Sequence, residues 1–227
     1  MIIAIDGPAA TGKSTTAKAV ADELGFTYLD TGAMYRAVTL AVLEKDISLT
    51  NENHLESFLT SLDLKILFTE KTFKIELDRI DVTERIRDPD VTAKVSEVSA
   101  LPAVRKTMVN LQRKLASGTD CIVEGRDIGT VVFPNAAVKF FMIADIRMRA
   151  ERRRKDLLAL EKNKDIGQLE IEIRDRDRKD SSRVHSPLSK AEDSIIIDTS
   201  HLDFHEQVNM IIEKVKTVQK GKNIKIK

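Results

Sequence analysis

The sequence predicts an α/β protein built on a parallel sheet, and two observations lead to that expectation. Short apolar runs recur along the chain, and long helical patterns lie between them. The runs are nearly continuous rather than alternating, which is typical of strands buried on both faces and covered by helical crossovers. We place the strands at residues 2–5, 26–29, 121–123, 138–143 and 195–197.

Helices are expected wherever apolar residues recur with a period near 3.6 between these strands. The first of them directly follows a glycine-containing loop. We place the helices at residues 13–24, 33–45, 52–61, 103–116, 146–161, 168–179 and 204–216. The lysine-rich residues 220–227 are expected to form a frayed tail.

One stretch has a different period and predicts a small insertion. Residues 62–68, 72–77 and 80–82 alternate apolar and polar side chains, as antiparallel hairpins with one polar face do. We therefore expect an inserted domain at residues 62–100, with three strands and a helix or two, and a core formed by residues 1–61 and 101–227. The alternative is that these strands extend the main sheet.

The composition indicates a globular protein without a general affinity for anions. Of the 227 residues, 42% are hydrophobic and 32% are charged, and 37 Lys plus Arg balance 36 Asp plus Glu for a net charge of +1. The single cysteine, Cys121, is expected in the core and cannot form an internal disulfide. No apolar run approaches the ~20 residues of a membrane span, and the early first strand leaves no room for a signal peptide. We therefore expect a cytoplasmic protein without a membrane partner.

The strongest motif is a phosphate-binding loop between the first strand and the first helix. Its two glycines permit a tight turn, its backbone N–H groups can surround a polyphosphate, and the helix adds the positive end of its dipole. Lys13 would reach the β and γ phosphates, and the Ser14 hydroxyl would bind Mg²⁺. A chance glycine turn is disfavoured because strand, motif and helix agree. The predicted nucleotide-binding residues are Gly7, Pro8, Ala9, Ala10, Thr11, Gly12, Lys13, Ser14 and Thr15.

Phosphate binding alone leaves the reaction open, and a GTPase switch is the first alternative. Its base-reading N-K-x-D pattern is approached only by Asn163-Lys164-Asp165, where the aspartate comes one place too early. Its D-x-x-G pattern occurs only at residues 22–25, at the end of a predicted helix. A kinase, which must also hold a second substrate, is therefore favoured.

Two later segments carry groups that suit a second anion. Asp30 or Thr31 can cap the helix after the second strand, and Tyr35 and Arg36 can share a face with Thr31. Arg126 and Asp127 follow the strand at residues 121–123, where ligands of open α/β sheets bind. The alternative for this Arg and Asp is an ion pair that only braces a loop.

Two arginine-rich segments, residues 147–154 and 174–183, flank a polar stretch at 155–168 that we expect to be mobile. Such arms can close over bound phosphates, exclude water and bring positive charge to the transferring group. In the second arm, Arg176, Asp180 and Arg183 stand at i, i+4 and i+7 and project to one side. A solvated helix face is one alternative. A nucleic-acid surface is disfavoured because aromatics form only 4% of the chain and none lies among these arginines.

From residue 2 to about residue 199 the sequence resembles the bacterial cytidylate kinases of the P-loop nucleoside-monophosphate kinase group. The segments that carry the resemblance are I-D-G-P-A-A-T-G-K-S, D-T-G-A-M-Y-R, V-S-E-V-S-A-L-P-A-V-R, E-G-R-D-I-G-T-V-V-F-P and R-D-R-K-D-S-S-R. The resemblance implies phosphoryl transfer from ATP to CMP or dCMP with Mg²⁺. It also implies a five-stranded parallel core, a monophosphate-binding insertion at residues 62–100 and a short helical lid at about 147–183.

The resemblance further implies roles for single residues. The monophosphate contacts would be Thr31, Arg36, Arg126 and Arg183, beside Tyr35. Cytosine recognition would fall on Ser96, Arg105 and Asp127, and sugar contacts on Arg176 and Asp180. The lid arginines would be Arg149 and Arg153, with Arg152 as an alternative. The expected catalytic set is Lys13, Arg126, Arg149, Arg153 and Arg183.

The chemistry of the base agrees with these assignments. CMP presents an N4 amino donor beside the N3 and O2 acceptors, so a carboxylate and an arginine would suit cytosine and repel uracil. The expected partners are small nucleotides, with no nucleic acid, and the protein is expected to be a monomer. Another small-molecule kinase on the same core, or a nucleotide-dependent binding module without catalysis, remains open.

Overall fold

The computed structural model describes residues 1–68, 73–159 and 163–224, and the chain divides into two compact units. The first unit comprises Met1–Leu29 and Gly118–Lys227, and the second comprises Asp30–Ser117. The segment expected as an insertion, residues 62–100, lies inside the second unit. That unit also contains the helices that flank the segment in the sequence.

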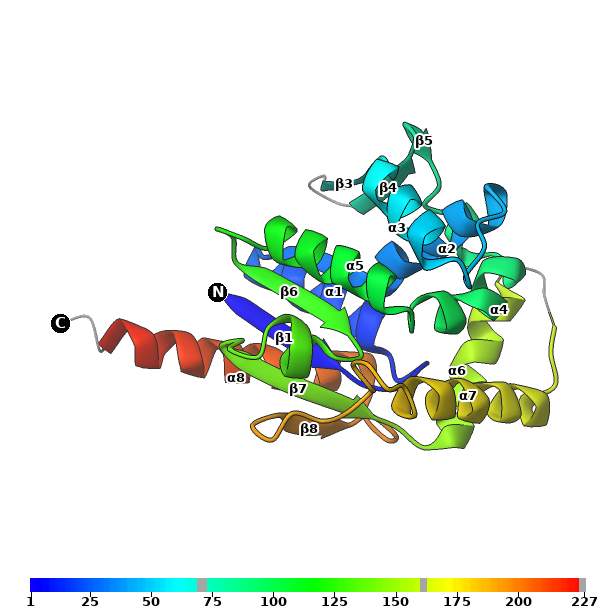
Figure 1. The fold of residues 1–227 in the computed structure, drawn as a ribbon. Coiled ribbons are helices and arrows are strands. Elements are labelled where there is room, and N and C mark those ends of the chain that lie inside the picture. The colour runs from blue at the N-terminus through cyan, green and yellow to red at the C-terminus, as the bar shows by residue number, and fades with distance from the viewer. Residues whose placement is uncertain (69–72, 160–162, 225–227) are drawn as a thin grey trace. The chain divides into compact units, whose positions relative to one another are not determined.

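A five-stranded sheet forms the centre of the first unit (Figure 1). In spatial order its strands are β2 (Thr27–Asp30), β6 (Cys121–Gly125), β1 (Ile2–Asp6), β7 (Val138–Ile143) and β8 (Ile195–Asp198). β1 pairs in parallel with β6 and with β7, and β7 pairs in parallel with β8. The predicted parallel α/β core is therefore confirmed. Each observed strand lies within two residues of its expected range.

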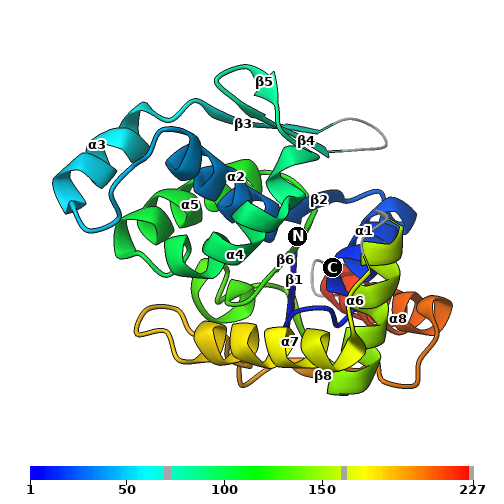
Figure 2. The same cartoon turned by 90° about the vertical axis from the view of Figure 1, so that its right-hand side faces the viewer.

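Two crossing helices follow β7 in the first unit (Figure 2). α6 (Ile146–Leu158) and α7 (Ile166–Ser181) enclose a small apolar cluster of Ala150, Leu157, Leu169 and Ile173. The Asp165 side chain caps α7 by accepting a hydrogen bond from the Gln168 N–H at 3.1 Å. Both helices extend into the polar stretch 155–168, of which residues 160–162 lie outside the described residues.

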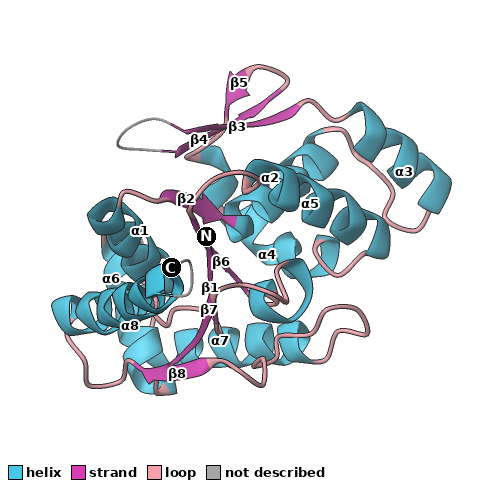
Figure 3. Ribbon diagram, turned by 90° about the vertical axis from the view of Figure 1, so that its left-hand side faces the viewer, coloured by secondary structure: helices cyan, strands magenta, loops and turns pink. Residues whose placement is uncertain are grey.

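The main core lies between the sheet and two helices, α1 (Lys13–Leu24) and α8 (Phe204–Ile224), which lie side by side (Figure 3). Val20 of α1 and Ile211 of α8 pack against strand residues such as Ile3 and Phe140, all at most 1% exposed. Cys121 is buried as expected, and burial raises its thiol pKa to about 12. Residues 220–224 continue α8, so the expected tail is helical there, and residues 225–227 lie outside the described residues.

A short π-helical turn, Ile128–Val132, follows β6 and was not expected from the sequence. Its residues Ile128, Gly129 and Val132 are buried. In the described ranges, no helix is both long and apolar enough to cross a membrane.

The second unit combines helices with a separate three-stranded antiparallel sheet. The helices are α2 (Thr31–Glu44), α3 (Glu52–Ser61), α4 (Pro89–Val98) and α5 (Pro102–Leu115), with a 3₁₀ turn at Arg85–Arg87. The strands are β3 (Leu64–Phe68), β4 (Phe73–Leu77) and β5 (Ile80–Asp81). Three antiparallel strands and added helices are thus confirmed, and the alternative that these strands extend the main sheet is wrong. Thr72, expected in the second strand, lies outside the described residues.

Candidate functional site

The loop between β1 and α1 has the backbone of a phosphate-binding loop. Gly7 (φ +148°), Ala10 (φ +59°) and Gly12 (φ +91°) adopt positive φ values. A Cβ atom on Gly7 would lie 2.2 Å from the carbonyl oxygen of Met142, so only glycine fits there. Within the described part of the chain, the backbone N–H groups of residues 10–15 form no hydrogen bond. Unpaired N–H groups in a loop that opens a helix can bind a phosphate.

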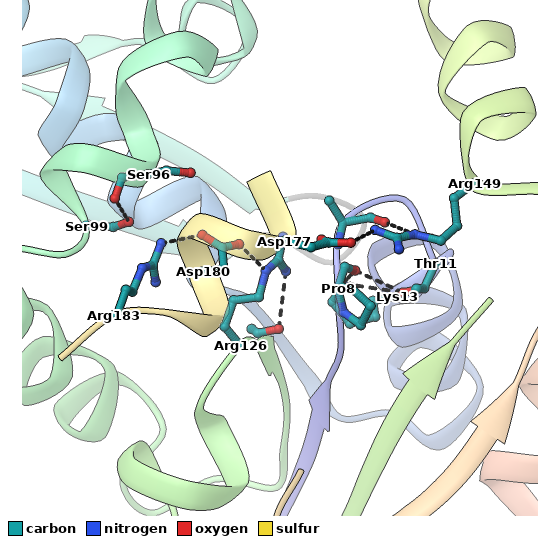
Figure 4. Close-up of polar contacts among 12 residues, drawn as sticks. Pro8, Thr11, Lys13, Ser96, Ser99, Arg126, Arg149, Asp177, Asp180 and Arg183 are labelled. Carbon is teal, nitrogen blue, oxygen red and sulfur yellow. Dashed lines mark hydrogen bonds and ion pairs between the residues drawn. The ribbon is translucent and has the colours of Figure 1, made fainter. Parts of the chain in front are cut away.

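Lys13 is buried inside this loop. Its Nζ donates to the carbonyl oxygen of Pro8 at 2.7 Å and to Thr11 Oγ1 at 3.5 Å (Figure 4). Burial, reinforced by Arg126, lowers the pKa of the Lys13 ammonium to about 7, while Glu124 acts to raise it. An anionic ligand at the loop would favour the charged form of this side chain.

Ser14 provides an oxygen at the start of α1. The residue is exposed, and its hydroxyl forms no hydrogen bond with the described residues. A hydroxyl oxygen is a suitable ligand for a hard cation such as Mg²⁺. The chemistry of this position therefore fits the predicted metal ligand.

Asp6 closes β1 beside the loop and was not singled out by the sequence. Its carboxylate is 4% exposed and accepts hydrogen bonds from the N–H groups of Ile128 at 2.8 Å and Gly129 at 2.7 Å. Burial raises the pKa of Asp6 to about 6, against the opposing effect of these two hydrogen bonds. Asp6 thereby holds the start of the turn at Ile128–Val132, directly after Arg126 and Asp127.

Asp180, near the end of α7, forms ion pairs with two arginines. Its side chain is 2% exposed, and its two oxygens accept hydrogen bonds from Arg126 Nε at 2.9 Å and Arg183 Nη2 at 2.6 Å (Figure 4). Although burial acts to raise it, Arg126, Arg183 and Arg176 hold the pKa of Asp180 below its usual range. Guanidinium groups gathered at one point are the groups that bind carboxylates and phosphates best.

Arg183 contacts Asp180 as predicted, but it does not lie on the same helix. α7 ends at Ser181, so Arg183 lies beyond the helix and cannot share a helical face with Arg176 and Asp180. Ser182 is the C-cap residue, so Arg183 contacts Asp180 from outside the helix. The expected i, i+4 and i+7 face is therefore wrong for Arg183, while the expected proximity to Asp180 is correct.

Two of the expected lid arginines hold carbonyl groups of the phosphate loop. Arg149 Nε donates to the carbonyl oxygen of Ala9 at 2.7 Å, and its Nη2 contacts Asp177 Oδ2 at 2.5 Å. Arg152 Nη1 donates to the carbonyl oxygen of Thr11 at 3.2 Å and to the Thr199 hydroxyl at 3.0 Å. Arg153 is half-buried and has no hydrogen-bond or ion-pair partner among the described residues.

In the second unit, two predicted residues lie at the start of α2. Asp30 is the N-cap and accepts a hydrogen bond from the Ala33 N–H at 2.9 Å, while Thr31 is the first helical residue. One turn later, Arg36 Nη1 donates to Thr92 Oγ1 at 2.8 Å and to the carbonyl oxygen of Ile86 at 3.3 Å. Arg36 is thus anchored by one group from the 3₁₀ turn and one from α4.

The other predicted residues of this unit cluster around α5. Arg105 is 4% exposed, donates to the carbonyl oxygen of Ser99 at 3.3 Å and lies with its guanidinium carbon 5.5 Å from the centre of the Tyr35 ring. Ser99 Oγ in turn donates to the carbonyl oxygen of Ser96 at 3.4 Å. The unit therefore brings Tyr35, Arg105 and the Ser96 region together.

Comparison with known proteins relates the chain to one family. The family model described as cytidylate kinase matches residues 3–217. A cytidylate kinase from Carboxydothermus hydrogenoformans is 49% identical over 215 residues, which cover 94% of this chain and 96% of that protein. One from Protochlamydia amoebophila is 44% identical over 225 residues, covering 96% and 98%.

A solved structure supports the fold alone. An uncharacterized protein from Eubacterium ventriosum ATCC 27560 aligns with a TM-score of 0.54 at 15% sequence identity. The alignment covers 96% of this chain and 98% of that chain.

Proposed function

Because the chain belongs to the cytidylate kinase family, we propose that it transfers the γ-phosphoryl group of ATP to CMP or dCMP, giving ADP and CDP or dCDP. The observation that carries this proposal is the phosphate loop. Its N–H groups at residues 10–15 are unpaired within the described part of the chain, and it encloses the Lys13 ammonium. These N–H groups and the ammonium group can bind and neutralise the polyphosphate of ATP. Phosphoryl transfer needs no protein nucleophile.

The donor would lie on the phosphate loop, with its charge spread over Lys13 and the loop N–H groups. Phosphoryl transfer passes through a loose transition state that is stabilised by in-line positioning and by cations. Ser14 would be the protein ligand of Mg²⁺, since its hydroxyl is exposed and unpaired among the described residues. When bound, Mg²⁺ would neutralise charge on the β and γ phosphates.

The monophosphate would be held by arginines and hydroxyl groups. The positions of Arg126 and Arg183 support this role, because both guanidinium groups are held by one buried carboxylate, that of Asp180. The proposed phosphate contacts are Thr31, Arg36, Arg126 and Arg183. The proposed base contacts are Ser96, Arg105 and Asp127, and the proposed sugar contacts are Arg176 and Asp180. Arg149 and Arg153 are proposed to act on the transferring group from α6.

The remaining features are also proposals. A net charge of +1 supports small nucleotides rather than nucleic acid as partners. We place the enzyme in the cytoplasm and expect a monomer. We further propose that residues 62–100 bind the monophosphate and that about 147–183 act as a lid.

A coupled assay with a panel of monophosphates tests the proposal. With ATP and Mg²⁺ saturating, kcat/KM should be highest for CMP and dCMP and lower for UMP, AMP and GMP. A preference for another monophosphate would favour a different small-molecule kinase. Binding of ATP without turnover of any monophosphate would favour a binding module.

A further inference from the structure

One residue of the phosphate loop is held at both of its backbone polar groups. The Ala9 N–H donates to Asp177 Oδ1 at 3.2 Å, and the Ala9 carbonyl oxygen accepts a hydrogen bond from Arg149 Nε at 2.7 Å. Asp177 Oδ2 and Arg149 Nη2 complete the ring at 2.5 Å (Figure 4). The ion pair between Arg149 of α6 and Asp177 of α7 therefore holds Ala9 at the two peptide groups on either side of its Cα atom.

The two following loop residues contact the same helices. Ala10 packs against the apolar cluster between α6 and α7, and the Thr11 carbonyl oxygen accepts a hydrogen bond from Arg152. Ala10 has φ +59°, a left-handed conformation that costs free energy in a residue with a Cβ atom and persists only where the surroundings impose it. The contacts on Ala9 and Thr11 flank this residue directly.

Asp177 does not occupy the part of the loop that would receive phosphates. It takes the N–H of Ala9, whereas the N–H groups of residues 10–15 form no hydrogen bond in the described part of the chain. Asp175, two residues earlier on α7, is exposed and pairs with Arg178 on the same helix at 2.9 Å. Of these two aspartates of α7, Asp177 binds the loop and Asp175 does not.

We propose that Asp177 is a positioning residue for the phosphate loop: through Ala9 and Arg149 it imposes the loop conformation that receives the triphosphate of ATP. Asp177 itself touches no nucleotide. The inference rests on the proposed use of this loop for ATP. It also links α7 to the loop, so a movement of α7 would be transmitted to the peptide next to the strained Ala10.

The test is Asp177→Asn, with Asp175→Asn as the matched control. Asparagine keeps one oxygen for the Ala9 N–H but turns an NH₂ donor toward Arg149, which breaks the ring of contacts. We expect the Kd for ATP, measured by calorimetry, to rise about tenfold while the Kd for CMP changes by less than about twofold. Asp175→Asn removes the same charge from the same helix and should leave both constants unchanged.

The sign of the effect separates positioning from simple electrostatics. Removing a negative charge near a triphosphate would by itself tighten ATP binding, so weaker binding identifies loop positioning. Unchanged or tighter ATP binding by a folded Asp177→Asn protein, checked by its thermal unfolding midpoint, overturns the inference. If the wild type still phosphorylates CMP in that case, the proposed function is unaffected.

A second measurement holds even if this variant folds poorly. In the wild type, the Ala9 amide should exchange with solvent at least about tenfold more slowly than the unpaired Ser14 amide, because its proton is bonded to a carboxylate. Equal exchange at the two amides overturns the inference. In an Arg149→Met background, Asp177→Asn should add little further loss of ATP affinity, because the two side chains pair with each other and both bind Ala9.

Discussion

Two buried carboxylates of the first unit are held in opposite ways. Asp6, at the end of β1, accepts hydrogen bonds from two backbone N–H groups. Asp180, on α7, lies between the guanidinium groups of Arg126 and Arg183. Burial raises the pKa of Asp6 to about 6, whereas the arginines hold the pKa of Asp180 below its usual range in spite of its burial.

The difference shows what each region can do. Two N–H dipoles do not offset the desolvation of a carboxylate, but full cations do. Asp6 therefore positions a turn, and its carboxyl group can change its charge near pH 6. In the region around Asp180, the carboxylate stays ionised across the physiological range and keeps the guanidinium groups of Arg126 and Arg183 in place. Lys13 lies close enough to both Asp6 and Arg126 for each to shift its pKa.

The largest effect is expected at Lys13, where the two regions meet. Lys13→Ala should lower kcat by ~10²- to 10³-fold, because it removes a preorganised cation from the transferring phosphates. CMP binding should remain largely intact. Steady-state turnover and CMP calorimetry measure the two effects. A kcat within threefold of the wild type would show that Lys13 does not act on the donor.

A smaller effect is expected from Arg126→Met, which removes one of the two guanidinium groups that bind Asp180. Removing a guanidinium that would donate charge-assisted hydrogen bonds to the phosphate of CMP should weaken CMP binding by about 2 kcal/mol, or roughly thirtyfold. Arg153→Met is the matched variant. It should lower kcat more than CMP affinity, because Arg153 is proposed to act on the transferring group and has no partner among the described residues whose loss would add a second effect. Normal CMP binding and turnover in both variants would identify these arginines as solvated surface.

The strands and the phosphate loop could be predicted because their signals are local. The apolar runs at residues 121–123 and 138–143 are nearly continuous, and strand, motif and helix agree around Lys13. The turn at residues 128–132 could not, because the run I-G-T-V-V-F is apolar enough to continue a strand. Asp6 binds two N–H groups of this turn, and these contacts join residues that are 122 and 123 positions apart along the chain, where no local pattern can show them.

The ion pairs of the candidate site were also hard to predict, because they join residues that are far apart in the sequence. In the run R-D-R-D-R, nothing local distinguishes Asp177 from Asp175. Only the packing of α7 brings Asp177 to Ala9, which is 168 residues away. The sequence also predicted arginines at the lid without showing that Arg149 and Arg152 would bind loop carbonyl groups.

Base choice offers a third test, since Asp127 directly precedes the turn that Asp6 binds. An aspartate that accepts from the cytosine N4 amino group would oppose the O4 acceptor of uracil. Asp127→Asn should therefore lower kcat/KM for CMP by about tenfold and narrow the gap between CMP and UMP. The measurement is kcat/KM for both monophosphates at saturating ATP. An unchanged ratio would show that Asp127 does not read the base.

The smallest effect is expected in how the free energy of unfolding depends on pH, and it should differ between Asp6 and Asp180. The pKa of Asp6 is raised by folding from 3.8 to about 6, so its stabilising contribution is present below pH 3.8 and is lost as the pH rises through about 6. Asparagine does not titrate. The free energy of unfolding of Asp6→Asn, relative to the wild type, should therefore increase by about 1 kcal/mol between pH 5 and pH 7. The lost hydrogen-bond acceptor shifts this difference equally at both pH values.

Asp180→Asn is the contrasting variant, because the pKa of Asp180 is lowered by folding. Its stabilising contribution is present above pH 3.8 and is lost only as the pH falls through the folded-state pKa. Between pH 5 and pH 7, Asp180 is therefore ionised in both the folded and the unfolded chain. The difference in unfolding free energy between Asp180→Asn and the wild type, measured by urea titration, should be constant across this window. A constant difference for Asp6→Asn as well would show that two backbone N–H groups suffice to hold a buried carboxylate ionised, and the contrast between the two regions would fail.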